Sequence, residues 1–128
     1  MTNPNWITAK VRYGNKFGRF LGFPTVNLIP GANFKKHQPG VYSVLLKINN
    51  KIYQGALYWG PRIMVGEKTN RLEIFIFDFS NLIYGQQISY QPLEFIRPPM
   101  DFKNFSQYKK QLDQDIREIK RSFASKTT

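Results

Sequence analysis

The chain is 128 residues long, which suits a single domain, and 41% of its residues are hydrophobic, enough to form a packed core. The absence of cysteine excludes disulfides and thiolate metal sites, and the apolar runs are too short and too often interrupted by charge to cross a membrane. The 19 Lys and Arg residues against 8 Asp and Glu residues give a formal net charge of +11, which favours nucleic acid, an anionic membrane or phosphorylated small molecules as partners.

Strand signals dominate the first three quarters of the chain. In chain order, the predicted strands cover residues 6–13, 41–48, 51–58, 71–79 and 87–95. The second and third should form a hairpin, because Asn49 and Asn50 between them tolerate the positive φ of a two-residue turn.

The spacing of apolar residues changes in the last part of the chain. Apolar residues recur there every three or four positions, which predicts one stripe on an α-helix: Phe105, Tyr108, Leu112, Ile116, Ile119 and Phe123. Asn104 or Ser106 is expected to cap its start. Short strands followed by one amphipathic helix indicate a mainly β protein, a closed antiparallel barrel with a C-terminal helix packed against it.

Residues 14–24 form a glycine-rich basic segment. Gly14, Gly18 and Gly22 are spaced by four, and Lys16 and Arg19 add positive charge. Backbone N–H groups beside such glycines can approach an anion closely, although the pattern is not a Walker A loop. A flexible loop with solvated cations is the alternative interpretation.

Thr25 and Asn27 follow this segment. If the chain is extended here, both side chains point to the same side and offer two neutral oxygen ligands. Mg²⁺ can use so few protein ligands only when substrate phosphates supply others. The alternative is a turn in which both side chains bond their own backbone.

Glu73 lies in the predicted strand over residues 71–79. Leu72, Ile74 and Ile76 should form one face, and Glu73, Phe75, Phe77 and Phe79 the other. A carboxylate on such an aromatic face is desolvated, which raises its pKa and suits a general base. Alternatively, Glu73 lies at the strand end, solvated or paired with Arg71. The single histidine, His37, is expected in a loop, so the usual triads and zinc sites are absent.

Six ordered motifs resemble the riboflavin kinase family, specifically the kinase module of the bacterial bifunctional flavin-synthesis enzyme. Residues 18–27, GRFLGFPTVN, resemble the family's G-R-x-L-G-F-P-T-A-N, and residues 40–42 its G-V-Y. Residues 72–79 resemble E-x-H-I-x-D-F, and residues 82–85 resemble L-Y-G. Residues 95–98 with Phe102 resemble F-I-R-P-x-x-x-F, and Gln111-Leu112 with Asp115 resembles Q-I-x-x-D.

This resemblance implies a six-stranded Greek-key barrel with a C-terminal helix, and ATP and riboflavin as substrates for FMN and ADP. It implies an ATP site made by Gly14, Lys16, Gly18, Arg19, Gly22, Phe23 and Pro24. It further implies that Thr25 and Asn27 hold Mg²⁺, that Glu73 is the general base, and that the flavin is covered by Arg97, Phe102 and Phe105.

Two residues depart from the family pattern. Phe75 stands where the family usually has His, and Tyr58 stands where it has Asn. A catalytically inactive flavin- or nucleotide-binding module is therefore one alternative. A nucleic-acid-binding barrel is a second, because the charge and aromatics such as Tyr53 and Trp59 suit phosphate contacts and stacking.

We expect one domain over residues 1–128, with its core at residues 6–123. The chain contains no adenylyltransferase motif, so the reaction is expected to stop at FMN. Residues 1–10 lack the apolar stretch of a signal peptide, and a monomeric cytoplasmic protein without a membrane partner is the resulting expectation.

Overall fold

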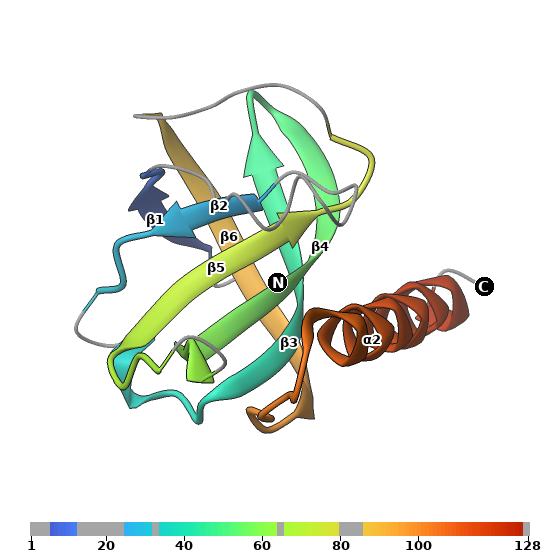
Figure 1. Cartoon of the computed structure of the whole chain (residues 1–128). Helices are drawn as coiled ribbons and strands as arrows, with labels where there is room; N and C mark the ends of the chain where they lie inside the picture. The colour runs from blue at the N-terminus through green and yellow to red at the C-terminus, as the bar shows by residue number, and fades with distance from the viewer. Residues whose placement is uncertain (1–5, 13–24, 32–33, 64–65, 80–85, 127–128) are drawn as a thin grey trace.

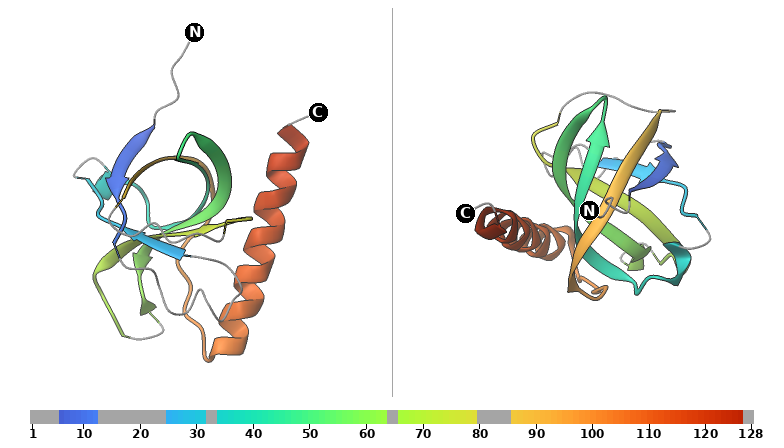
Figure 2. Two further views of the ribbon diagram at one scale, coloured as in Figure 1. Left: turned by 90° about the horizontal axis from the view of Figure 1, so that it is seen from above. Right: turned by 180° about the vertical axis from the view of Figure 1, so that it is seen from behind.

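The computed structural model describes residues 6–12, 25–31, 34–63, 66–79 and 86–126. Six strands curve into a barrel, and one long helix lies outside it (Figures 1 and 2). The elements are β1 (Ile7–Lys10), β2 (Thr25–Leu28), a short 3₁₀ helix (Phe34–Lys36), β3 (Gly40–Ile48), β4 (Lys51–Pro61), β5 (Asn70–Ile76), β6 (Gln87–Arg97) and α2 (Phe105–Lys126).

The sheet has the order β1-β6-β3-β4-β5-β2, and its paired strands are antiparallel. Strands β3, β4 and β5 are consecutive neighbours, whereas β6 returns to lie beside β3, which is the Greek-key arrangement. The barrel closes where Val11 bridges Leu28 and the Arg12 N–H donates to the Asn27 carbonyl at 2.7 Å. Closure leaves β1 and β2 without a long open edge. The predicted mainly β barrel with a C-terminal helix is confirmed.

Local sequence explains the turn and the helix start. Asn49 and Asn50 adopt φ values of 51° and 66°, which a two-residue hairpin turn requires and Asn tolerates. The Asn104 side chain accepts a hydrogen bond from the Gln107 N–H at 2.9 Å, so Asn104 rather than Ser106 caps α2.

The structure decides one open alternative and corrects one prediction. The segment with Thr25 and Asn27 is extended, because residues 25–28 form β2 rather than a turn. Phe79 was assigned to the face of Glu73, yet it packs in the barrel interior, edge-on to Tyr53 at 5.0 Å. The reason is that β5 ends at Ile76 and Asp78 adopts a φ of 57°, which breaks the alternation of faces.

The side chains form two apolar clusters. The barrel interior is filled by residues such as Val44, Leu46, Leu57 and Ile74, all fully buried. The second cluster lies on the outer face, where the apolar stripe of α2 covers Val41, Ala56, Phe75 and Phe77; the helix contributes Leu112, Ile116, Ile119 and Phe123. Within the described part of the chain, no helix has both the length and the hydrophobicity to cross a bilayer.

Candidate active site

One row of paired residues crosses the outer face of the barrel. Asn27 on β2 pairs with Glu73 on β5, and Glu73 pairs on its other side with Tyr58 on β4. The row continues from Tyr58 to Val41 on β3 and from Val41 to Arg97 on β6. Residues directly opposite each other in a ladder project to the same side of the sheet, so the five side chains share the face that α2 partly covers.

Thr25 belongs to the adjacent row. It pairs with Phe75, so it projects to the same side as Asn27 and Glu73. The hydroxyl, the carboxamide and the carboxylate predicted from the sequence therefore lie together on two neighbouring strands.

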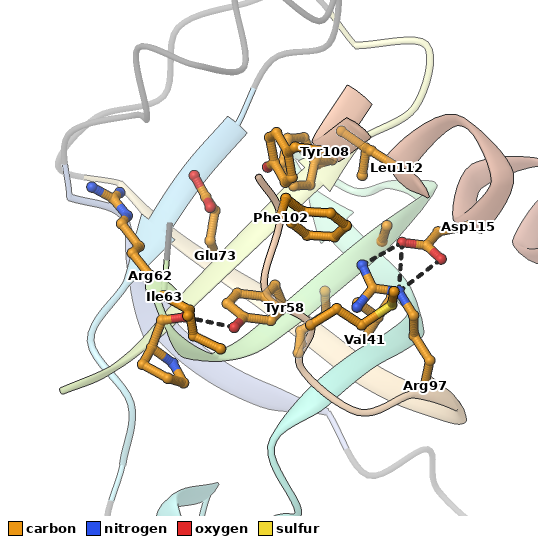
Figure 3. Close-up of a pocket in the computed structure, with 15 residues that line it drawn as sticks. Val41, Tyr58, Arg62, Ile63, Glu73, Arg97, Phe102, Tyr108, Leu112 and Asp115 are labelled. Atoms are coloured by element: carbon orange, nitrogen blue, oxygen red, sulfur yellow. Dashed lines mark hydrogen bonds and ion pairs between the residues drawn. The ribbon is translucent and has the colours of Figure 1, made fainter. Parts of the chain in front are cut away.

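A cavity of about 90 Å³ opens between this face, the start of α2 and the segment that joins β6 to α2 (Figure 3). Its walls are mainly aromatic and aliphatic and include Tyr58, Phe102, Tyr108 and Leu112. Its charged lining residues are Arg62, Glu73, Arg97 and Asp115. Such a largely apolar recess with a few converging polar groups is typical of a small-molecule site.

Glu73 is 5% exposed within this cavity. Its position inside β5 excludes the alternative of a solvated strand end, and Arg71 instead pairs with Glu67 at 2.6 Å. Burial raises the pKa of Tyr108, and the negative charge of Glu73 adds to that rise. Burial also raises the pKa of Tyr58, where Arg97 opposes the shift and Glu73 adds to it. Both phenols are therefore neutral around Glu73 at neutral pH.

Arg97 and Asp115 form the second charged group of the cavity. The Arg97 Nε donates to both carboxylate oxygens of Asp115, at 3.0 and 3.1 Å, and Nη2 donates at 2.8 Å. Gln111 also donates to Asp115, at 2.9 Å. Gly40 lets β3 lie close to the Arg97 backbone on β6, because a Cβ at Gly40, whose φ is 151°, would collide with the Arg97 carbonyl oxygen. This ion pair fixes α2 against β6.

A second cavity, of about 520 Å³, is lined by Asn27 but not by its ladder partner Glu73. Its charged lining residues are Arg12, Lys68, Arg71 and Glu67, so cations outnumber the one carboxylate and we call it the basic cavity. The two partners of one ladder pair thus face different cavities: Glu73 the apolar one and Asn27 the basic one. Such a layout can hold an apolar ring and a polyanion on either side of one reaction point.

The family comparison agrees with this geometry. The family model described as flavokinase, riboflavin kinase, matches residues 1–123. The chain belongs to the riboflavin kinase family.

Two curated relatives share about a third of their residues with the chain. A bifunctional riboflavin kinase/FMN adenylyltransferase from Haemophilus influenzae is 34% identical over 128 residues, which is 95% of this chain and 40% of the relative. The RNA-binding riboflavin kinase RibR from Bacillus subtilis is 36% identical over 118 residues, 91% of this chain and 50% of the relative. The chain thus spans half or less of the length of these two relatives.

A solved structure has the same fold. It is described as a macrolide-efflux protein from Streptococcus pneumoniae and superposes with a TM-score of 0.77 at 30% identity, covering 91% of this chain and 38% of that one.

The structure separates the three residues that the family resemblance assigned to the flavin. Arg97 and Phe102 line the apolar cavity, and Phe102 packs edge-on to Tyr108 at 5.5 Å. Phe105 does not line that cavity; it contacts Tyr108, with ring centres 6.0 Å apart. Both departures from the family pattern, Tyr58 and Phe75, line this cavity, and Phe75 is also buried in the cluster under α2.

All seven residues predicted for the ATP site lie outside the described residues: Gly14, Lys16, Gly18, Arg19, Gly22, Phe23 and Pro24. Their role stays a prediction. The described residues that flank this segment are Arg12, which lines the basic cavity, and Thr25, two positions before Asn27.

The described residues hold no group of three or more His, Cys, Asp or Glu side chains placed to bind a metal ion. The oxygens of Thr25 and Asn27 nevertheless fit Mg²⁺, provided that a nucleotide supplies further oxygen ligands.

Sequence reasoning missed two residues of the site, Arg62 and Tyr108. Tyr108 was expected only as part of the apolar helix stripe, and Arg62 follows the end of β4 and belongs to none of the six motifs.

Proposed function

We propose that the protein transfers the γ-phosphoryl group of ATP to the ribityl 5′-hydroxyl of riboflavin, giving FMN and ADP. The pairing of Asn27 with Glu73 between the two cavities carries this proposal. It brings a buried carboxylate next to neutral oxygen ligands, with an apolar cavity on one side and a basic cavity on the other.

In this proposal the flavin ring occupies the apolar cavity, beside Tyr58, Phe102 and Tyr108. Pockets for molecules of drug size measure roughly 300–1,000 Å³, so the cavity of about 90 Å³ must widen. Met100 and Phe102, on the segment between β6 and α2, are the side chains that would move; Met100 is already 42% exposed.

ATP occupies the basic cavity, where Arg12 and Lys68 meet its charge, and the glycine-rich segment over residues 14–24 completes the phosphate site. Thr25 and Asn27 would hold Mg²⁺ beside the phosphates. When bound, the ion neutralises part of the charge on the phosphate oxygens.

Glu73 orients the 5′-hydroxyl and accepts its proton as the bond between the 5′-oxygen and the γ-phosphorus forms. The bond between that phosphorus and the β,γ-bridging oxygen breaks, and ADP leaves. The low polarity of the cavity keeps water from competing for the phosphoryl group.

The test is FMN formation from riboflavin, ATP and Mg²⁺, followed by chromatography. Glu73→Gln should lower kcat by about 10²–10⁴-fold while riboflavin still binds. Glu118→Gln removes an exposed carboxylate from α2 and serves as the matched control, with unchanged turnover expected.

Near-normal turnover in Glu73→Gln would remove Glu73 from the mechanism. Flavin binding by the unmodified protein without FMN formation would support an inactive flavin-binding module instead. Steeply salt-dependent binding to oligonucleotides alone would support the nucleic-acid-binding barrel. The cytoplasmic location and the monomeric state expected from the sequence stay predictions.

A further inference from the structure

Two arginines line the apolar cavity, and their surroundings differ. Arg97 is neutralised by Asp115 through three hydrogen bonds of 2.8 to 3.1 Å. Arg62 has no ion pair among the described residues, and its Nε is buried without a hydrogen-bond partner there. Buried guanidinium N–H groups in folded proteins are nearly always paired, so this one calls for an acceptor that the described residues do not supply.

The backbone on both sides of Arg62 is held in place. The Tyr58 hydroxyl donates to the Pro61 carbonyl at 2.6 Å, and the Glu67 N–H donates to the Arg62 carbonyl at 3.1 Å. The half-buried side chain therefore starts from a fixed point at the end of β4. In Figure 3 the guanidinium of Arg62 and the carboxylate of Glu73 point to the same side of the cavity.

Other cations near the site are less suited to this position. Arg71 is engaged by Glu67 at 2.6 and 3.1 Å, and it lines the basic cavity rather than the apolar one. Arg12 and Lys68 also line the basic cavity. Among the described residues, Arg62 is the unpaired cation on the acceptor side, next to the proposed general base.

We propose that Arg62 binds the phosphoryl group on the acceptor side of the reaction, both during its transfer and as the phosphate of FMN. This inference rests on the proposed function. A planar guanidinium presents a fork of donors that matches two phosphate oxygens. Negative charge is spread over the equatorial oxygens of the phosphoryl group in flight. The carboxylate of Glu73 would repel that negative charge, and the positive charge of Arg62 offsets this repulsion.

Riboflavin and FMN differ only in the phosphate group, so the role of Arg62 predicts different effects on their binding. Riboflavin has no group for Arg62 to bind, whereas FMN does. Arg62→Gln should therefore weaken FMN binding by about tenfold or more, the effect of losing one charge-assisted contact. Riboflavin binding should change by less than about twofold. The variant should also have a lower kcat, because Arg62 no longer stabilises the charge on the phosphoryl group during its transfer.

The experiment measures the Kd of each flavin by quenching of flavin fluorescence in the full chain, with thermal unfolding as a check on folding. Arg117→Gln removes an equal charge from the exposed face of α2 and should leave both Kd values unchanged. Arg62→Lys keeps the charge but loses the fork, so an intermediate FMN affinity is expected. If Arg62→Gln does not fold, the Lys variant decides the matter through the same comparison of the two flavins.

Equal losses for riboflavin and FMN, or no loss for either, would overturn the assignment and leave Arg62 a structural residue. The proposed function fails by a different result, because the unmodified protein would then make no FMN from riboflavin and ATP. A protein that makes FMN, but whose Arg62→Gln variant binds FMN normally, refutes only the role of Arg62.

Discussion

The barrel interior and the outer face under α2 are formed by alternate residues of the same strands, yet they are built differently. On β5, Leu72, Ile74 and Ile76 point inward and are at most 1% exposed, whereas Glu73 and Phe75 point outward. The interior consists almost entirely of close-packed apolar side chains. The outer face combines apolar packing with a carboxylate, two arginines and a cavity.

This difference shows how the fold separates stability from function. A closed interior supplies apolar burial that does not depend on the outer face. The outer face can then tolerate a partly open cavity and buried charge, which would weaken a core. Substitutions on the outer face should accordingly affect stability where they break its buried ion pair, and catalysis where they remove its polar ligands.

The largest effect on stability is expected where the outer face carries a buried ion pair. Asp115→Asn leaves the guanidinium of Arg97 without its partner, and the side chains of this pair are only 15% and 2% exposed. We expect the free energy of unfolding to fall by about 3 kcal/mol, measured by urea denaturation.

Asp113→Asn is the matched control for that variant. It breaks the Lys109–Asp113 pair at 3.3 Å, whose side chains are 48% and 40% exposed, and should cost less than about 0.5 kcal/mol. Equal losses in the two variants would show that the Arg97–Asp115 pair is no more important than a surface pair.

A smaller effect, on catalysis rather than stability, is expected at β2. Thr25→Ala and Asn27→Ala each remove one neutral oxygen ligand, so each should raise the Mg²⁺ concentration for half-maximal FMN formation by roughly tenfold. Thr8→Ala, on the exposed side of β1, is the control. An unchanged Mg²⁺ titration in both β2 variants would indicate that Thr25 and Asn27 are only structural.

The smallest effect at neutral pH is expected inside the barrel. The Tyr90 side chain is fully buried, and its hydroxyl has no hydrogen-bond partner among the described residues, so Tyr90→Phe should change stability at pH 7 by about 1 kcal/mol or less. At alkaline pH the variant should differ more. Burial raises the pKa of Tyr90 from 10.0 to about 12, so the unfolded chain loses this proton first.

The free energy of unfolding should therefore fall as the pH rises from about 10 to 12, and Tyr90→Phe should make that fall shallower. Part of the slope should persist, because burial also raises the pKa values of Tyr42, Tyr58 and Tyr108. Chemical denaturation at a series of pH values measures the slope. Identical slopes in both proteins would contradict a neutral buried Tyr90.

Features fixed by neighbours in the chain were predictable from the sequence. The hairpin at Asn49 and Asn50 and the cap of α2 at Asn104 depend on local backbone conformation and local hydrogen bonds. The helix stripe depends on a period that is visible over several turns. The family resemblance, likewise read from ordered motifs, is confirmed by the family match over residues 1–123.

Features that depend on strand pairing were decided by the tertiary structure. Strand β2 has only four residues, too few for a clear period, and it is extended because β5 supplies its hydrogen-bonding partners. The same register sets Asn27 opposite Glu73. The position of Phe79 was predicted wrongly because the positive φ of Asp78 reverses the alternation, and no regular pattern records that. Arg62 and Tyr108 reach one cavity from a strand end and a helix, since the packing of α2 against the outer face of the barrel brings together residues that are far apart in the chain.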